Sequence, residues 1–298
     1  MKKFVRRSRR NIYYYYLFLL TLLSMKTILA PVDFSEASIN ALSFAAELSK
    51  KASARLVIIN TLQGGENEEE TKNKLKSLES DLKRSFGQDL KFESYLAHGD
   101  LVTTLEKVIA VQHPDLIVMG TKGASGLKRI LIGSNTVNVI AKTMMPVLVI
   151  PEVARFKNFF NAGKNRIVLA TDLDELKNED GLVILKEIAL QIVNPKVRVL
   201  SIRPRKTGLP DFKRLYRDFL LSFFNPEIES ERVTVFSSNV IRGINFYLNE
   251  NEDTGLVAMI ARNSGHLIQK HFTREMASRT HLPLLVLHDT EKKWASYP

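Results

Sequence analysis

Apolar residues between positions 25 and 151 follow two patterns that alternate along the chain. Short apolar runs rich in β-branched residues predict five strands, at Thr27–Val32, Leu56–Ile59, Leu90–Leu96, Leu116–Met119 and Val147–Ile150; the run at Leu90–Leu96 alternates, and the others are mostly continuous. Between them, apolar residues recur every three or four positions and predict four amphipathic helices, around 41–48, 75–86, 101–109 and 137–144. Strands that alternate with helices and are apolar on both faces favour an α/β fold, with a parallel sheet covered by helices on both sides.

The same pattern occurs twice in the chain. Lys26–Asp33 (KTILAPVD) resembles Asn165–Asp172 (NRIVLATD), and Pro146–Ile150 (PVLVI) resembles Pro283–Leu287 (PLLVL). The aspartate that ends the first motif lies 113 positions before the proline that opens the second, and 111 positions separate them in the second copy. Two motifs at nearly equal separation indicate a duplicated domain.

We therefore predict two domains, at 25–151 and 165–290, with a linker at 152–164 and a tail at 291–298. The linker contains Phe156, Phe159 and Phe160, which predict that it packs against a domain. In the second copy we expect strands at 166–171, 197–202, 232–236, 255–260 and 284–287, and helices near 177–193, 210–224, 239–250 and 267–280.

The chain of 298 residues has a net charge of +11, and this charge is unevenly distributed. Residues 1–24 contain six basic and no acidic residues, whereas residues 25–151 contain 15 basic and 14 acidic ones. A strongly basic protein ordinarily suggests nucleic acid or membrane as a partner. Because the first domain is nearly neutral and carries no nucleic-acid-binding motif, we do not expect nucleic acid as a partner.

The basic N-terminal stretch precedes an apolar run at Ile12–Leu23. Twelve residues are too few to span a bilayer, which needs about 20, but they fit the apolar region of a signal peptide. Three interpretations stay open: translation that begins at Met25, a membrane tether and a cleaved signal. Without residues 1–24 we expect no membrane partner.

The residue types in the chain exclude several kinds of site. It contains no cysteine, which rules out disulfides, thiolate nucleophiles and zinc–thiolate sites and fits a cytoplasmic location. Its six histidines lack metal-ligand spacing, so we expect no protein metal site. No G-x-S-x-G elbow follows a strand, so we expect no hydrolase triad.

A glycine-rich stretch, GTKGASGLKRILIGS, runs from Gly120 to Ser134. Glycine lets a backbone N–H approach a ligand closely, and the free N–H groups at the start of a helix favour an anion such as phosphate. Ser134 is expected either as a hydroxyl ligand or as the cap of the following helix. With the strand order 3-2-1-4-5, Asp33 and Gly120 end neighbouring strands and face one crevice, where such folds bind ligands.

These residues resemble the universal stress protein family. Gly120, Gly123, Gly133 and Ser134 match its nucleotide loop, G-x2-G-x9-G-[ST], and Asp33 after Pro31-Val32 matches its first-strand aspartate. The resemblance is close over 25–151, loose over 165–288, and implies two flavodoxin-like domains, like those of the adenine-nucleotide α-hydrolases.

The resemblance also implies a ligand and a partner. It implies ATP, with Mg²⁺, bound without a dedicated catalytic apparatus. Asp33 would lie near the adenosine, the glycines and Ser134 around the phosphates, and Thr61, after the second strand, against the adenine. Asn135 and Thr136 would add polar contacts at the helix start. The family pairs through its last strand, which implies that 147–150 and 284–287 join the two copies as an intramolecular pseudo-dimer; a further homodimer stays open.

Two alternatives concern the aspartate and the second copy. Asp33-Phe-Ser-Glu36 has the spacing of a helix capping box, which Asp172-Leu-Asp-Glu175 repeats, so Asp33 is expected either to bind ligand or to cap a helix. The second copy places Ile260, Asn263 and Lys270 where glycines would fall. We therefore predict that it does not bind ATP in the family manner and that it packs against the first domain or binds another ligand.

Three functions remain in view. The first is an ATP-binding stress protein in which the nucleotide is a signal or a structural ligand. The second is a slow ATPase or autophosphorylating enzyme, with Ser134 or Thr136 as the phosphate acceptor. The third is a nucleotide-free dimerising scaffold.

Overall fold

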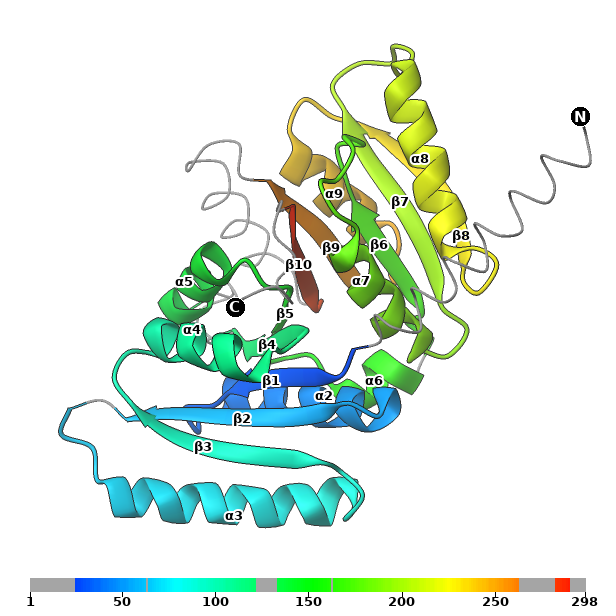
Figure 1. The fold of residues 1–298 in the computed structure, drawn as a ribbon. Helices are drawn as coiled ribbons and strands as arrows, with labels where there is room; N and C mark the ends of the chain where they lie inside the picture. The colour runs from blue at the N-terminus through cyan, green and yellow to red at the C-terminus, as the bar shows by residue number, and fades with distance from the viewer. Residues whose placement is uncertain (1–24, 63, 122–132, 162, 263–281, 290–298) are drawn as a thin grey trace, which may run out of the picture.

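The computed structural model describes residues 25–62, 64–121, 133–161, 163–262 and 282–289. Their strands form one sheet of ten, in the order β3-β2-β1-β4-β5-β10-β9-β6-β7-β8, with helices on both faces (Figure 1). Among these residues, no helix is both long and apolar enough to cross a bilayer. Residues 1–24, with the apolar run at 12–23, lie outside the described part of the chain.

The first domain contributes five parallel strands in the predicted order 3-2-1-4-5. They are β1 (Thr27–Pro31), β2 (Arg55–Leu62), β3 (Phe92–His98), β4 (Leu116–Gly120) and β5 (Val147–Ile150). Its helices are α2 (Glu36–Ala52), α3 (Glu68–Phe86), α4 (Leu101–Gln112) and α5 (Ser134–Thr143). The predicted doubly wound α/β fold is confirmed.

The second domain repeats this order. Its strands are β6 (Arg166–Ala170), β7 (Lys196–Arg203), β8 (Glu229–Phe236), β9 (Thr254–Arg262) and β10 (Leu284–Asp289), parallel to one another. Its helices are α7 (Asp180–Leu190), α8 (Asp211–Phe224) and α9 (Val240–Asn249). The helix predicted at 267–280 lies outside the described residues.

The two domains meet through their last strands. β5 and β10 are antiparallel neighbours, with Leu284 opposite Val149 and Val286 opposite Val147. The sheet therefore continues from one domain into the other.

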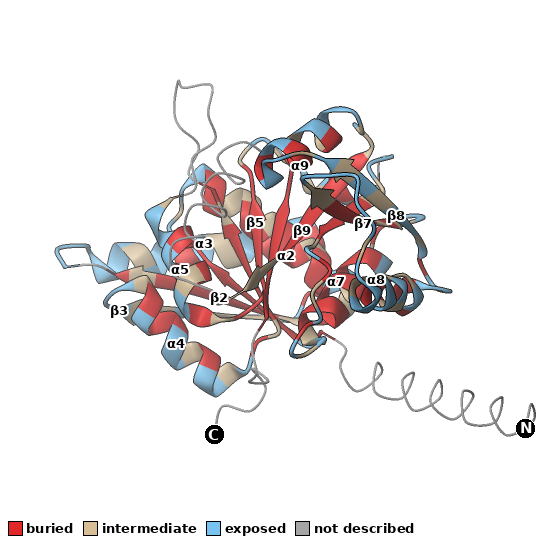
Figure 2. Ribbon diagram, turned by 90° about the horizontal axis from the view of Figure 1, so that it is seen from above, coloured by how far each residue is buried: buried red, intermediate tan, exposed pale blue. Residues whose placement is uncertain are grey.

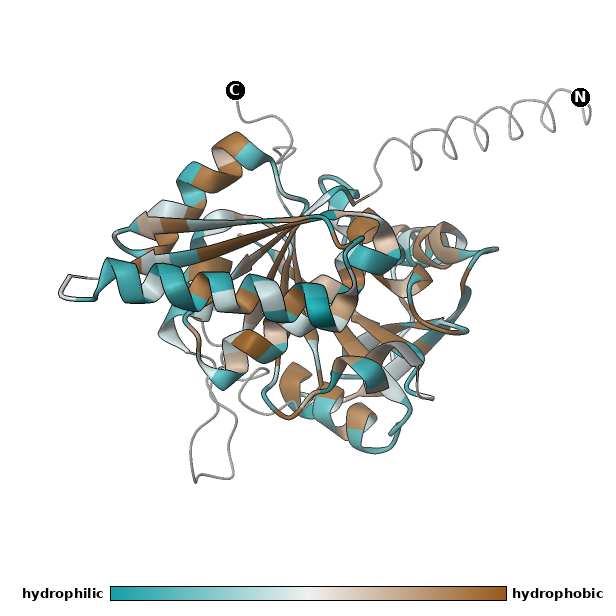
Figure 3. Cartoon of the chain, turned by 90° about the horizontal axis from the view of Figure 1, so that it is seen from below, coloured by the Kyte–Doolittle hydropathy of each residue, from teal (hydrophilic) through white to brown (hydrophobic). Residues whose placement is uncertain are grey.

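Apolar residues are buried on both faces of the sheet. Ile28 and Leu29 are adjacent on β1 and point to opposite faces, and both are fully buried. One apolar cluster lies under α2, α3, α7 and α8, and the other lies under α4, α5 and α9. Figure 2 shows buried strands at the centre, and Figure 3 shows the same strands as largely hydrophobic, next to helices in which hydrophilic and hydrophobic residues are interspersed. This two-sided burial explains why the central strands are continuous apolar runs rather than alternating ones, whereas the edge strands β3 and β8 contain no buried residue.

The linker forms a short helix, α6 (Phe156–Asn161), that packs against the first domain. The rings of Phe156 and Phe159 lie edge-on to Phe44 of α2, with centroids 6.4 and 5.5 Å away, and Phe156 also contacts Phe86 of α3 at 5.7 Å. Phe156 and Phe159 of the linker thus pack against the first domain as predicted. The side chain of Phe160 lies outside the described set.

Candidate functional site

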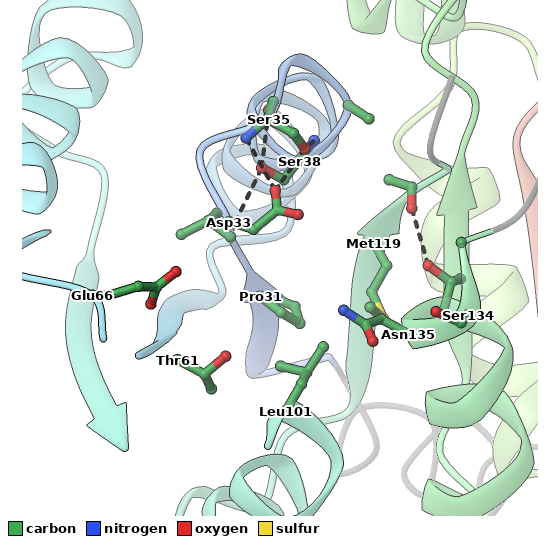
Figure 4. Close-up of a pocket in the computed structure, with 15 residues that line it drawn as sticks. Pro31, Asp33, Ser35, Ser38, Thr61, Glu66, Leu101, Met119, Ser134 and Asn135 are labelled. Atoms are coloured by element: carbon green, nitrogen blue, oxygen red, sulfur yellow. Dashed lines mark hydrogen bonds between the residues drawn. The ribbon is translucent and has the colours of Figure 1, made fainter. Parts of the chain in front are cut away.

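A pocket of about 250 Å³ opens at the carboxyl ends of the central strands of the first domain (Figure 4). It lies where the winding of the sheet reverses between β1 and β4, which is the usual ligand site of doubly wound folds. Seven of the eight predicted nucleotide-binding residues line it: Asp33, Thr61, Gly120, Gly133, Ser134, Asn135 and Thr136. The eighth, Gly123, lies outside the described residues.

Asp33 stands just beyond β1, on the α2 side of the pocket. One of its carboxylate oxygens accepts hydrogen bonds from the backbone N–H and the hydroxyl of Ser35, at 3.0 and 2.6 Å. Desolvation acts to raise the pKa of Asp33, but hydrogen bonds from Ser35 and Ser38 outweigh it and hold the pKa below its ordinary value. Asp33 is therefore an ionised hydrogen-bond acceptor, and Figure 4 shows its carboxylate pointing toward the space between α2 and α5.

The capping-box interpretation of Asp33 is wrong. Ser35 is the residue that caps α2, and its hydroxyl oxygen accepts the backbone N–H of Ser38 at 3.3 Å. Phe34 has a left-handed backbone, with φ of 60°, and this turn separates Asp33 from the helix. Asp33 therefore supports the cap from outside the helix and keeps one oxygen directed at the pocket.

The same interpretation is wrong in the second copy. α7 begins at Asp180, eight positions after Asp172, and the side chain of Asn178, not of Asp172, accepts the backbone N–H of Asp180 at 3.1 Å. The predicted start at 177 is therefore three residues too early. Asp172–Glu175 belongs to a longer connection, with Leu173 left-handed at φ of 62°.

The start of α5 forms the opposite wall of the pocket. Gly133 is its capping position, with φ of −62° and ψ of 150°, and no described side chain caps the helix. Ser134 is the first helical residue and lines the pocket, so the alternative that Ser134 is the cap is wrong. By contrast, side chains cap the other three long helices of this domain: Ser35, Asn67 and Asp100.

An uncapped helix start carries backbone N–H groups and the positive end of the helix dipole, both of which favour an anion. The side chain of Thr136 is occupied, because its hydroxyl donates to the carbonyl oxygen of Gly120 at 3.1 Å and ties α5 to β4. The hydroxyl of Ser134 is on the exposed side of the same turn.

Gly120 has a structural role that its place in the glycine-rich stretch did not reveal. A Cβ atom at this position would lie 2.3 Å from the carbonyl oxygen of Ala37 in α2. Real side chains do not approach a backbone so closely, so α2 can lie against the end of β4 only because residue 120 is a glycine. The requirement comes from a helix more than 80 positions away, which no local motif reports.

The wall of the pocket at β2 contains one predicted residue and three that the motif did not indicate. The predicted one, Thr61, is in β2 itself, one residue before the strand ends, rather than after it. Leu101 at the start of α4, Met119 on β4 and Glu66 in the β2–α3 connection complete this side of the pocket. Figure 4 shows the Glu66 carboxylate directed toward the pocket. The described residues contain no group of three or more side chains that could hold a metal ion.

In the second domain, the strand register places Ile260 where the first has Gly120, because Ile28 pairs with Leu116 and Ile167 pairs with Leu256. The structure thus places Ile260 at a glycine position, as the alignment of the two copies predicts. Asn263 and Lys270, the other two residues in place of glycines, lie outside the described residues.

Comparisons with known proteins identify the first domain. Residues 25–151 match the model of the universal stress protein family. Universal stress protein MJ0577 of Methanocaldococcus jannaschii is 35% identical to this chain over 82 residues, which are 28% of the chain and 49% of that protein. The match thus spans about half the length of this relative.

Solved structures show the fold of the whole chain. A universal stress protein from Archaeoglobus fulgidus superimposes with a TM-score of 0.69 and 18% identity, over 89% of this chain and 98% of that one. Protein PA1789 from Pseudomonas aeruginosa superimposes with a TM-score of 0.63 and 13% identity, over 90% and 94%. Residues 25–151 therefore form a domain of the universal stress protein family, and the second half of the chain repeats the fold of that domain.

Proposed function

We propose that the first domain binds ATP, with Mg²⁺ on the phosphates, and that the nucleotide serves as a signal or structural ligand in a stress response. The observation that carries this proposal is the start of α5, which no side chain of the described residues caps and which opens into the pocket opposite the Asp33 carboxylate. The family match over residues 25–151 supports it.

The charges of the pocket orient the nucleotide. Asp33 is ionised and Glu66 lies on the same side, so both repel phosphate and accept hydrogen bonds from hydroxyl groups. The N–H groups of Ser134 and Asn135 suit phosphate oxygens. The ribose therefore lies at Asp33, the base lies toward Thr61 and Leu101, and the phosphates lie at α5.

Mg²⁺ fits this arrangement as an ion carried by the phosphates. Mg²⁺ keeps several waters and needs only one or two protein ligands when phosphates coordinate it. Ser134 is exposed at the phosphate end and offers one hydroxyl oxygen. The two carboxylates lie at the other end of the pocket.

The site favours binding over turnover. A general base works best when its pKa is near the working pH, and the lowered pKa of Asp33 makes it a weak base. Should phosphoryl transfer to the chain occur, Ser134 is the better acceptor, because Thr136 is buried and its hydroxyl is committed to Gly120.

The proposal extends to assembly and location. The antiparallel pairing of β5 with β10 supports an intramolecular pseudo-dimer, in which the second domain takes the place of a partner subunit. We propose a cytoplasmic location for this two-domain unit.

Calorimetry on the full chain tests the proposal. Adenosine, inorganic triphosphate and ATP–Mg²⁺ are titrated separately. We expect ATP–Mg²⁺ to bind more tightly than either fragment, since it engages both ends of the pocket. Absence of binding by all three would contradict the proposal and leave the nucleotide-free scaffold as the function.

A further inference from the structure

The position in the second domain that corresponds to the first domain's pocket lies at the carboxyl ends of β6 and β9, and we call it the crevice of the second domain. Asp172 corresponds to Asp33, and each is followed by a left-handed residue, Leu173 and Phe34, with φ of 62° and 60°. Asp174 and Glu175 then correspond to Ser35 and Glu36, so the backbone of 172–175 forms the wall that 33–36 forms in the first domain.

In the second domain a side chain of the same chain lies against this wall. Arg262, the last residue of β9, directs its guanidinium group at it. Nε lies 3.2 Å from a carboxylate oxygen of Asp172, and Nη1 lies 2.5 Å from a carboxylate oxygen of Asp289 on β10. Nη1 also donates to the carbonyl oxygen of Glu175 at 3.1 Å, and Nη2 donates to the carbonyl oxygen of Asp174.

The acceptors around Arg262 are themselves held in place. The side chain of Asp289 is only 4% exposed, and its other oxygen accepts the backbone N–H of Lys177 at 2.7 Å. Asp172 accepts the backbone N–H of Asp174 at 3.1 Å, and Lys213 of α8 donates to the carbonyl oxygen of Asp172 at 2.8 Å. The guanidinium group therefore fits a prearranged set of oxygens on three sides.

The other end of this crevice is also filled. Strand register places Ile202 of β7 where the first domain has Thr61, because Val57 pairs with Leu29 and Arg198 pairs with Val168. α9 lies so close to Ile202 that a Cβ atom at Gly243 would be 2.7 Å from its Cγ2. The space beside Thr61 in the first domain is thus taken up by side chain and helix in the second.

We propose that the crevice of the second domain is a guanidinium site, occupied by Arg262 of the same chain. Carboxylates and carbonyl oxygens surround this position, so it attracts a planar cation and repels phosphate, and Arg262 takes the place that is open beside Asp33 in the first domain. If the first domain binds ATP as proposed above, the chain then takes one nucleotide rather than two.

Chemical rescue tests this assignment in the full chain. Arg262→Ala removes the cation and leaves the buried carboxylate of Asp289 unpaired, so we expect the melting temperature to fall by about 5 °C or more. Methylguanidinium at about 10 mM should restore much of this loss, because a planar cation can re-enter the site, and methylammonium should restore little. Arg242→Ala on the exposed side of α9 is the matched control and should respond to neither compound.

Several results would overturn the assignment. One is equal stability of the Arg262→Ala and Arg242→Ala variants, and another is equal rescue by the two cations. Should Arg262→Ala fail to fold, Arg262→Lys keeps the charge and loses the forked geometry. This variant should melt below the unaltered chain, and an unchanged melting temperature would count against a guanidinium-specific site.

Nucleotide stoichiometry separates this inference from the proposed function. A calorimetric ratio of one ATP per chain agrees with both, and a ratio of two contradicts the filled crevice. Absence of ATP binding contradicts the proposed function alone, since the rescue by methylguanidinium does not depend on nucleotide.

Discussion

The carboxylate of Asp33 receives both the backbone N–H and the hydroxyl of Ser35, and the Ser35 hydroxyl oxygen in turn caps α2. One oxygen of Asp33 is thereby committed to the protein, and the rotation of the side chain is restricted. The wall of the pocket is built before any ligand arrives, which lowers the entropic cost of binding.

Asp33→Asn should weaken binding at the adenosine end of the pocket without weakening binding at the phosphate end. The variant keeps an oxygen for Ser35 but loses the charge, so adenosine and ATP should bind about 10-fold more weakly. Inorganic triphosphate should bind as well as before or better, because a repulsive charge has been removed. Calorimetry with the three ligands measures this, and Asp81→Asn on the exposed face of α3 is the control. Equal weakening of adenosine and triphosphate would contradict the proposed orientation.

Ser134→Pro tests the helix start at the other end. Proline suits the first position of a helix, and Gly133, with φ of −62° and ψ of 150°, already has the backbone that precedes proline. The change removes one N–H, and ATP should bind about 10-fold more weakly while adenosine is unaffected.

Two matched variants serve as controls for Ser134→Pro. Ser134→Ala removes only the hydroxyl and should have a smaller effect on ATP. Asp211→Pro makes the same change at the first residue of α8 and should leave ATP binding unchanged. If Ser134→Pro binds ATP as tightly as the unaltered chain, the phosphates do not lie at α5.

Gly120→Ala and Gly133→Ala should behave differently. The Cβ at 120 meets the backbone of α2, so this variant should lose about 1–3 kcal/mol of stability whether or not nucleotide is present. Gly133 has a backbone that any residue adopts, so its variant should keep the melting temperature. Denaturant unfolding without ligand compares them, and a stable Gly120→Ala variant would show that α2 does not need the close approach.

The buried His288 should make the stability of the folded protein depend on pH. This β10 side chain is buried, and its ring nitrogens have no hydrogen-bond partner among the described residues. Desolvation lowers its pKa from 6.5 to about 4. Between these values the unfolded chain binds more protons than the folded one, so stability is full above pH 6.5 and falls as the pH drops toward 4.

His288→Leu should flatten this part of the profile, because the proton-binding difference disappears. Denaturant midpoints at pH 4.5 and 7, compared with those of the unaltered chain, measure the effect. An identical slope in the His288→Leu variant would place the acid sensitivity elsewhere.

The strands and the pocket wall at Asp33 could be predicted because each depends on a local pattern, whereas the strand order was taken from the flavodoxin-like fold class. Continuous apolar runs mark two-sided strands, and the aspartate directly follows one of them. The role of Gly120 could not be predicted, since it depends on how closely α2 packs. Arg262 was likewise hidden, because its partners Asp172 and Asp289 come together only through the topology of the sheet.

The seam between β5 and β10 has a mechanical consequence. Both apolar clusters run through it and contain residues of both domains, so neither half can unfold without exposing part of the other's interior. A ligand that binds only the folded first domain therefore also resists unfolding of the second. Ligand binding in the first domain therefore stabilises the second domain, which does not touch the pocket, because the two domains unfold cooperatively. This coupling needs no conformational change.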